Sequence, residues 1–171
     1  MIRDIPQFRI LAFGVATAAV LALAAGSTAS RAPGLVGPSS ELDPAAVVRT
    51  ELEALAHNDE PWPDAGIEAT WAFASPENRS ATGPLPRFRR LFENPVYGPM
   101  VDHVAARVSE ARRLGEAALV GVVLDGADGR RRGYLFRLSR ADRDGCEACW
   151  MTDSVLPVPV PQDRDGTGPA I

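Results

Sequence analysis

Apolar residues recur every three or four positions after residue 43, as they do on the buried face of a helix. Asp43-Pro44 is a typical helix start, because the Asp side chain accepts hydrogen bonds from free N–H groups and Pro suits the first helical position. We expect this helix to run to about His57, with apolar positions at Ala45, Val48, Leu52 and Leu55.

The same spacing predicts two further helices. One begins at Asp64 and ends at Ser75-Pro76, and the next begins near Pro84 and ends at Asn94-Pro95. These ends are expected because the residue before a proline avoids the helical region. The apolar faces carry Ile67, Trp71 and Ala74 in the first, and Leu85, Phe88, Leu91 and Phe92 in the second.

The second half of the chain has the patterns of strands. Residues 117–124 form an apolar, Val-rich run, and residues 134–139 alternate between apolar and polar side chains. A last strand is expected over 149–156, with Pro157 stopping it. Gly-containing turns at 125–129 and 142–145 join these strands into an antiparallel meander. Residues 99–115 fit a helix or a strand, and periodicity slightly favours a helix. Helices followed by a sheet indicate an α+β domain, with the helices packed on one sheet face.

The two ends of the chain differ from this middle part. Residues 1–29 combine a short basic start, an uncharged apolar run over 10–25 and the small residues Ser27-Thr28-Ala29, as an export signal does. They are read as a signal peptide or an N-terminal membrane anchor, so we expect an exported protein, periplasmic or extracellular, or one anchored through residues 10–25. Residues 30–42 are Pro-, Gly- and Ser-rich and predict a flexible linker. Residues 43–156 form the single folded domain, and residues 157–171 a disordered tail.

Composition excludes several classes of function. The formal net charge is -4 over 171 residues, which disfavours nucleic acid as a partner. Membrane contact is expected only through the N-terminal segment. Only His57 and His103 are present, so a zinc site of three histidines within this chain is excluded. No metal-ligand spacing, glycine-rich phosphate loop or nucleophile elbow is seen, and neither a metal nor a cofactor is expected.

The densest cluster of polar side chains lies between the first two predicted helices. His57, Asp59, Glu60 and Asp64 surround Trp62, which stands between two prolines. A His beside carboxylates suits general base chemistry or ligand contact, and Trp62 would add apolar contact. The same residues also fit a helix end followed by a solvated loop. We take these five residues as the candidate ligand or partner contact and name no catalytic residue.

Cys146 and Cys149 have the spacing of a redox motif. The segment leads into a predicted strand, whereas a redox motif of the thioredoxin type opens a helix. In one extended strand the two Cα atoms would be ~10 Å apart, too far for a disulfide. A structural disulfide therefore requires Cys146 to lie in the preceding turn, and two unpaired thiols are the alternative. Trp150, which follows, is expected to be buried.

Five short motifs can be read together: 52–60 (Leu-Glu-Ala-Leu-Ala-His-Asn-Asp-Glu), Phe73-Ala74-Ser75-Pro76, Thr82-Gly83-Pro84 with Phe88, Tyr97-Gly98-Pro99-Met100, and 149–155 (Cys-Trp-Met-Thr-Asp-Ser-Val). Over about residues 44–156 they resemble the family called domain of unknown function 4864, with the nuclear transport factor 2-like cone fold. The resemblance implies helices packed into a curved antiparallel sheet with a pocket at its open end. It also implies a strand rather than a helix over 99–109, and we adopt the strand as the expectation. It implies no activity, since that fold serves enzymes and binding domains alike.

These observations lead to two hypotheses about function. The first is an exported, non-catalytic binding or interaction module whose partner is an unknown protein or small molecule. The alternative is a small-molecule enzyme or carrier that uses the pocket of the cone. The lining of that pocket distinguishes them: two or more inward carboxylate or His groups favour an enzyme, and a filling of large apolar side chains favours an interaction module.

Overall fold

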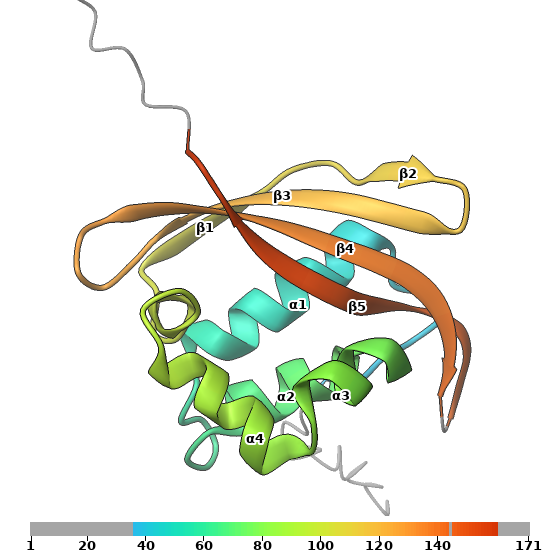
Figure 1. Cartoon of the computed structure of the whole chain (residues 1–171), viewed down its shortest axis with the longest axis horizontal. Coiled ribbons are helices and arrows are strands. Elements are labelled where there is room, and N and C mark those ends of the chain that lie inside the picture. Colours follow the sequence, from blue (N-terminus) through green and yellow to red (C-terminus); the bar gives the residue numbers. More distant parts are fainter. Residues whose placement is uncertain (1–35, 144, 161–171) are drawn as a thin grey trace, which may run out of the picture. The chain divides into compact units, whose positions relative to one another are not determined.

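The helices come first along the chain and cover one face of a curved, unclosed antiparallel sheet (Figure 1). The computed structural model describes residues 36–143 and 145–160. Its helices are α1 (Pro44–Ala56), α2 (Ala65–Phe73), α3 (Pro76–Thr82) and α4 (Leu85–Arg89), with 3-10 turns at Arg90–Glu93 and Gly98–Met100. Its strands are β1 (Ala105–Val108), β2 (Arg112–Leu114), β3 (Ala117–Asp125), β4 (Arg131–Arg143) and β5 (Cys146–Val158). The predicted α+β class is confirmed.

The first helix begins as the sequence indicates. The side chain of Asp43 accepts a hydrogen bond from the Ala46 N–H at 2.7 Å, and Pro44 occupies the first turn. The buried side of α1 carries Val47, Val48, Leu52 and Leu55, and it also carries Glu51. Because α1 packs on β3 and β5, the apolar side chains on this side belong to the core between the helices and the sheet.

The segment after α2 contains a helix that was not expected. Helix α2 ends before Ser75, as predicted, but the Ser75 hydroxyl oxygen then accepts a hydrogen bond from the Asn78 N–H at 3.2 Å. Ser75 is therefore the N-cap of α3, and Pro76 stands at its first position. Asp64 precedes α2 but makes no side-chain cap.

Residues 99–115 do not form the helix that their periodicity favours. They contain β1 and β2, which both pair with β3 in antiparallel register. The strand implied by the resemblance over 99–109 is present only over 105–108. The edge of β3 offers a row of backbone partners, and pairing with it outweighs a weak helical period. Val104, an anchor of that helical period, is 75% exposed.

The long strands form the predicted meander, in the order β1-β3-β4-β5, with β2 also beside β3. Along β3 every second residue faces the helices, namely Ala118, Val120, Val122 and Leu124. On β4 the same face carries Tyr134, Phe136 and Leu138, and Val120 pairs with Phe136. The sheet therefore contributes one continuous apolar wall to the core.

The last strand is longer than expected. It continues through Pro157, which pairs with Tyr134, to Val158, so the prediction that Pro157 stops the strand is wrong. A proline is tolerated there because β5 is the end strand of the sheet and has a ladder partner on one side only. The expected signal or anchor over 1–29 and most of the expected tail lie outside the described residues. In the part of the chain that the structure describes, no helix is long and apolar enough to cross a membrane.

Candidate functional site

A carboxyl group is buried between the helices and the sheet. Glu51, on the inner side of α1, is only 1% exposed. Its Oε1 accepts a hydrogen bond from the Thr152 hydroxyl on β5 at 2.5 Å. Its Oε2 is buried and has no hydrogen-bond partner among the described residues. Such an unpartnered oxygen is costly in an apolar interior, and it marks Glu51 as a residue that packing alone does not explain.

Burial decides the charge of this carboxyl group. Loss of hydration raises the pKa of Glu51 from 4.5 to about 8, and the hydrogen bond from Thr152 lowers it only in part. Glu51 is therefore mainly protonated at neutral pH. A protonated carboxyl group can donate a hydrogen bond, which a carboxylate cannot do.

The junction between α2 and α3 holds Thr152 in place. The backbone carbonyl oxygen of Thr152 accepts hydrogen bonds from the Ser75 N–H and from the Asn78 side chain, both at 3.0 Å. Ala74 forms an isolated parallel bridge with Thr152. Three segments of the chain thus meet at one buried pair of side chains, and the orientation of the Thr152 hydroxyl toward Glu51 follows from that junction.

Glu51 and Thr152 line a pocket of about 270 Å³, which we call the Glu51 pocket. Most of its wall is apolar and comes from α1, α4, the 3-10 turns and the sheet; it includes Leu55, Phe88, Leu91, Phe92, Met100 and Phe136. Helix α3 contributes Ala81 and Thr82 to the lining, and β5 contributes Ser154. The pocket therefore combines a large apolar wall with one buried acid, as sites for small molecules do.

Most other polar groups of the pocket are already engaged. The Tyr97 hydroxyl donates to the Val155 carbonyl at 3.0 Å. The Asp153 carboxylate accepts a hydrogen bond from Ser139 at 2.8 Å and lies 4.0 Å from the guanidinium of Arg137. Thr70 donates to the Gly66 carbonyl. Ser154 also lines the pocket and is half-buried, so Glu51 is the fully buried polar residue of the lining whose side chain has an oxygen without a partner among the described residues.

Sequence reasoning missed Glu51, although a signal was present. It stands four residues after Val47 and four before Leu55, which places a carboxyl group within the apolar stripe of α1. An acid at such a position is worth singling out. Thr152, 101 residues away along the chain, could not be matched to it from the sequence.

The predicted contact loop folds on itself. The buried side chain of Asn58 accepts a hydrogen bond from the Ile67 N–H at 3.1 Å and donates to Asp59 and Asp64. Asp59 in turn accepts from the Asp64 N–H at 3.0 Å. Much of the acidic density between α1 and α2 is therefore explained by closure of this loop.

Arg89 of α4 neutralises the same loop from outside. Its guanidinium lies 3.7 Å from the carboxylate of Asp64 and 3.8 Å from that of Glu68. Glu68 also accepts a hydrogen bond from the indole N–H of Trp62 at 3.3 Å. Trp62 is 44% exposed and does not belong to the core. None of Asp59, Trp62 and Asp64 lines the Glu51 pocket.

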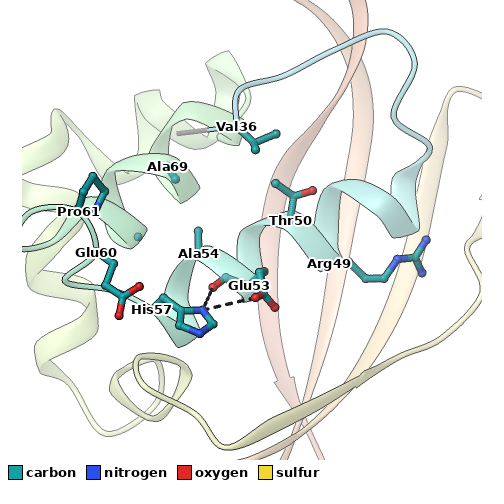
Figure 2. A pocket seen from close by; sticks show the side chains of 10 residues that line it. Val36, Arg49, Thr50, Glu53, Ala54, His57, Glu60, Pro61 and Ala69 are labelled. Atoms are coloured by element: carbon teal, nitrogen blue, oxygen red, sulfur yellow. Dashed lines mark hydrogen bonds and ion pairs between the residues drawn. The ribbon is translucent and has the colours of Figure 1, made fainter. Parts of the chain in front are cut away.

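His57 and Glu60 lie instead along a broad groove between α1 and α2, which also includes Val36 and Pro61 (Figure 2). His57 contacts Glu53 through the backbone carbonyl at 3.1 Å and through the carboxylate at 3.5 Å. The hydrogen bond to the Glu53 carbonyl, helped by the nearby carboxylates, raises the pKa of His57. The groove is larger, at about 720 Å³, but it opens widely to solvent. Because water screens its charges, we base the functional argument on the Glu51 pocket.

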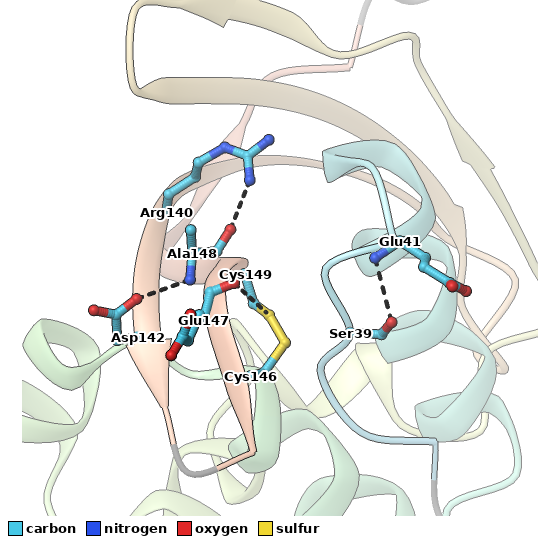
Figure 3. Close-up of a disulfide and its surroundings, with 8 residues drawn as sticks. All are labelled: Ser39, Glu41, Arg140, Asp142, Cys146, Glu147, Ala148 and Cys149. Carbon is cyan, nitrogen blue, oxygen red and sulfur yellow. Dashed lines mark hydrogen bonds between the residues drawn. A yellow bond between two sulfur atoms is a disulfide. The ribbon is translucent and has the colours of Figure 1, made fainter.

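Cys146 and Cys149 form a disulfide near the start of β5 (Figure 3). Their Cα atoms are 6.0 Å apart. Both lie in the strand, so the expectation that Cys146 must occupy the preceding turn is wrong. The register shifts between the pairs Ala141–Cys149 and Arg143–Cys146, and Ala148 has a φ of 49°. This bulge bends the strand and brings the two residues within bonding distance.

Trp150 is buried, as predicted, at 4% exposure. It belongs to the main core cluster, and the guanidinium groups of Arg113 and Arg140 lie 5.6 and 4.9 Å from the centre of its ring. Its role is therefore structural. Among the described residues, no group of three or more His, Cys, Asp or Glu side chains is arranged to hold a metal ion.

Comparison of the chain with models of protein families, with curated proteins and with solved structures found no match in any of the three.

Proposed function

We propose that this protein is an exported, non-catalytic binding module that takes a small, mostly apolar molecule into the Glu51 pocket. The observation that carries the proposal is the unpartnered Oε2 of Glu51 in the lining of an otherwise apolar pocket. A cavity of ~150 Å³ is enough for benzene, so one of about 270 Å³ suits a molecule of bicyclic size.

The fold and the sequence add independent support. Helices that cover one face of a curved antiparallel sheet, with a pocket between the layers, are consistent with the nuclear transport factor 2-like cone and with the domain of unknown function 4864 family. The basic and apolar start of the chain supports export. A disulfide between Cys146 and Cys149 agrees with an oxidising compartment.

Binding is favoured over catalysis because proton transfer in a closed site usually needs a second group. The other carboxylate in the lining, that of Asp153, is engaged by Ser139 and Arg137, and the Tyr97 hydroxyl is engaged by Val155. The alternative of a small-molecule enzyme has two observations in its favour, the first being that two carboxyl groups, those of Glu51 and Asp153, line the pocket. The second is that a carboxyl group whose pKa is about 8 can act as a general acid or base near neutral pH.

Binding is tested with 2-isopropenylnaphthalene, a neutral apolar probe of bicyclic size, by titration calorimetry. We expect saturable binding to one site. Ala81→Phe and Ser154→Phe place a ring in the lining of the pocket and should each weaken binding at least tenfold. Ser80→Phe is the matched control, because Ser80 is exposed on the same helix α3 and does not line the pocket. Absence of binding, or equal binding by all three variants, overturns the proposal.

The enzyme alternative makes a different prediction. With 2-acetonaphthone in D₂O, a catalytic Glu51 accelerates exchange of the α-hydrogens of the ketone, which NMR follows directly. Glu51→Gln should then reduce the exchange to the rate in buffer. A binding module leaves the exchange at the buffer rate with the unaltered protein.

A further inference from the structure

The buried pair of Glu51 and Thr152 determines which class of ligand the Glu51 pocket binds. We infer that the ligand is an uncharged molecule with one hydrogen-bond acceptor, such as a carbonyl oxygen, which the Glu51–Thr152 pair meets with a single O–H donor. This inference rests on the proposed function and adds the chemical class of the ligand.

The count of hydrogens in the pair leads to this conclusion. A protonated carboxyl group and a hydroxyl group carry two O–H hydrogens between them. One of these forms the hydrogen bond between Thr152 Oγ1 and Glu51 Oε1. The other has no acceptor among the described residues, whichever oxygen bears it, because Oε2 of Glu51 has no partner there and Thr152 Oγ1 has none besides Glu51. The pair therefore has one donor left, and a ligand satisfies it with an acceptor.

The surroundings of the pair exclude a charged ligand. No Arg side chain lines the pocket, so an anion entering it has no opposite charge to replace its hydration. Loss of hydration raises the pKa of Glu51, so the acid itself is mainly neutral at physiological pH and offers no charge to a cation. The other carboxylate of the lining, that of Asp153, is engaged by Ser139 and by the guanidinium of Arg137. The wall beyond the pair, including Phe88, Phe92 and Phe136, accommodates the apolar body of the ligand.

Three naphthalene derivatives of nearly the same shape test the inference. 2-Isopropenylnaphthalene and 2-acetonaphthone have the same number of non-hydrogen atoms and differ only in a CH₂ group against a carbonyl oxygen. 2-Naphthoate replaces the methyl ketone with a carboxylate. At about pH 6 we expect the ketone to bind at least fivefold more tightly than the alkene, because it accepts the spare hydrogen bond. The carboxylate should bind at least tenfold more weakly than the ketone.

The pH dependence and two variants assign this preference to Glu51. At about pH 9.5 the ionised acid has no hydrogen to donate, so the preference for the ketone should disappear. Glu51→Gln keeps an N–H donor and does not titrate, and its preference should persist at both pH values. The double variant Glu51→Met with Thr152→Val removes both O–H groups of the pair, and its preference should be absent at both pH values. Circular dichroism at each pH checks that the variants are folded.

The outcomes separate the two proposals. Binding of the alkene and the ketone with equal affinity at about pH 6 overturns this inference and leaves the binding function intact. A preference for the ketone that is unchanged at the higher pH in the unaltered protein also overturns it, since the donor is then not Glu51. Failure of every probe to bind overturns both proposals. If the double variant does not fold, the comparison of the unaltered protein with Glu51→Gln still decides the question.

Discussion

Replacement of Glu51 by Gln is expected to remove most of the pH dependence of stability between pH values of about 5 and 8. In the folded protein, burial raises the pKa of Glu51 from 4.5 to about 8. The folded state therefore keeps its proton over a range in which the unfolded state releases it. The contribution of Glu51 to stability is fully present below pH 4.5 and is lost as the pH rises toward 8.

The size of this effect follows from the same values. One pKa unit corresponds to about 1.4 kcal/mol, so a rise from 4.5 to about 8 lowers the free energy of unfolding by roughly 5 kcal/mol once both states are ionised. At pH 7 the loss is roughly 3 kcal/mol. Gln has nearly the same shape, keeps an oxygen for the Thr152 hydroxyl and does not titrate. The stability of Glu51→Gln relative to the unaltered protein should thus increase by about 1.4 kcal/mol per pH unit in this range.

Urea unfolding at about pH 5.5, 6.5 and 7.5, followed by circular dichroism, measures this difference. Glu110→Gln is the control, because Glu110 is exposed beside β1 and its removal should leave the dependence on pH unchanged. Curves of stability against pH that run parallel for the unaltered protein and Glu51→Gln would refute the reasoning. The carboxyl group would then ionise equally in both states, and the single-donor account of the pocket would fail with it.

Three further variants test the structure. Trp150→Ala should lower the free energy of unfolding by ~3–5 kcal/mol, measured with urea, because it leaves a cavity in the core cluster; an unchanged midpoint would show that β5 is misplaced. Trp62→Ala should change stability by less than ~1 kcal/mol, since the side chain is 44% exposed, and an unfolded variant would make Trp62 a core residue. Replacing Cys146 and Cys149 together by Ser should cost about 2 kcal/mol, the value for so short a loop, and reduction of the unaltered protein should give the same loss.

The sequence by itself determined the α+β class and most of the long elements. The start of α1 is encoded locally, because Asp43 and Pro44 satisfy the free end of the helix without help from distant residues. Alternation along 134–139 fixed which side chains of β4 face the core, since a strand turns successive side chains to opposite faces. The burial of Trp150 followed from the same kind of pattern.

Tertiary structure decided the elements whose local signal was weak. The weak helical period over 99–115 gave way to β1 and β2, because β3 supplied backbone partners that no local pattern shows. Pro157 remained in β5 because that strand lies at the end of the sheet. The disulfide formed within β5 because a bulge against β4 bends the strand between Cys146 and Cys149.

The site depended on tertiary structure most of all. The sequence pattern singled out the acidic loop after α1 as the candidate contact. In the structure, Asn58 and Arg89 contact the carboxylates of this loop. These contacts depend on how the helices pack, so the sequence pattern does not predict them. Glu51, on the apolar face of α1, was not among the residues that the sequence pattern singled out. Its significance comes from Thr152, which is 101 residues away and reaches it only because β5 pairs with β4 and packs against α1. Local spacing determines which face a side chain occupies, whereas burial, and with it the protonation of Glu51, is a property of the whole fold.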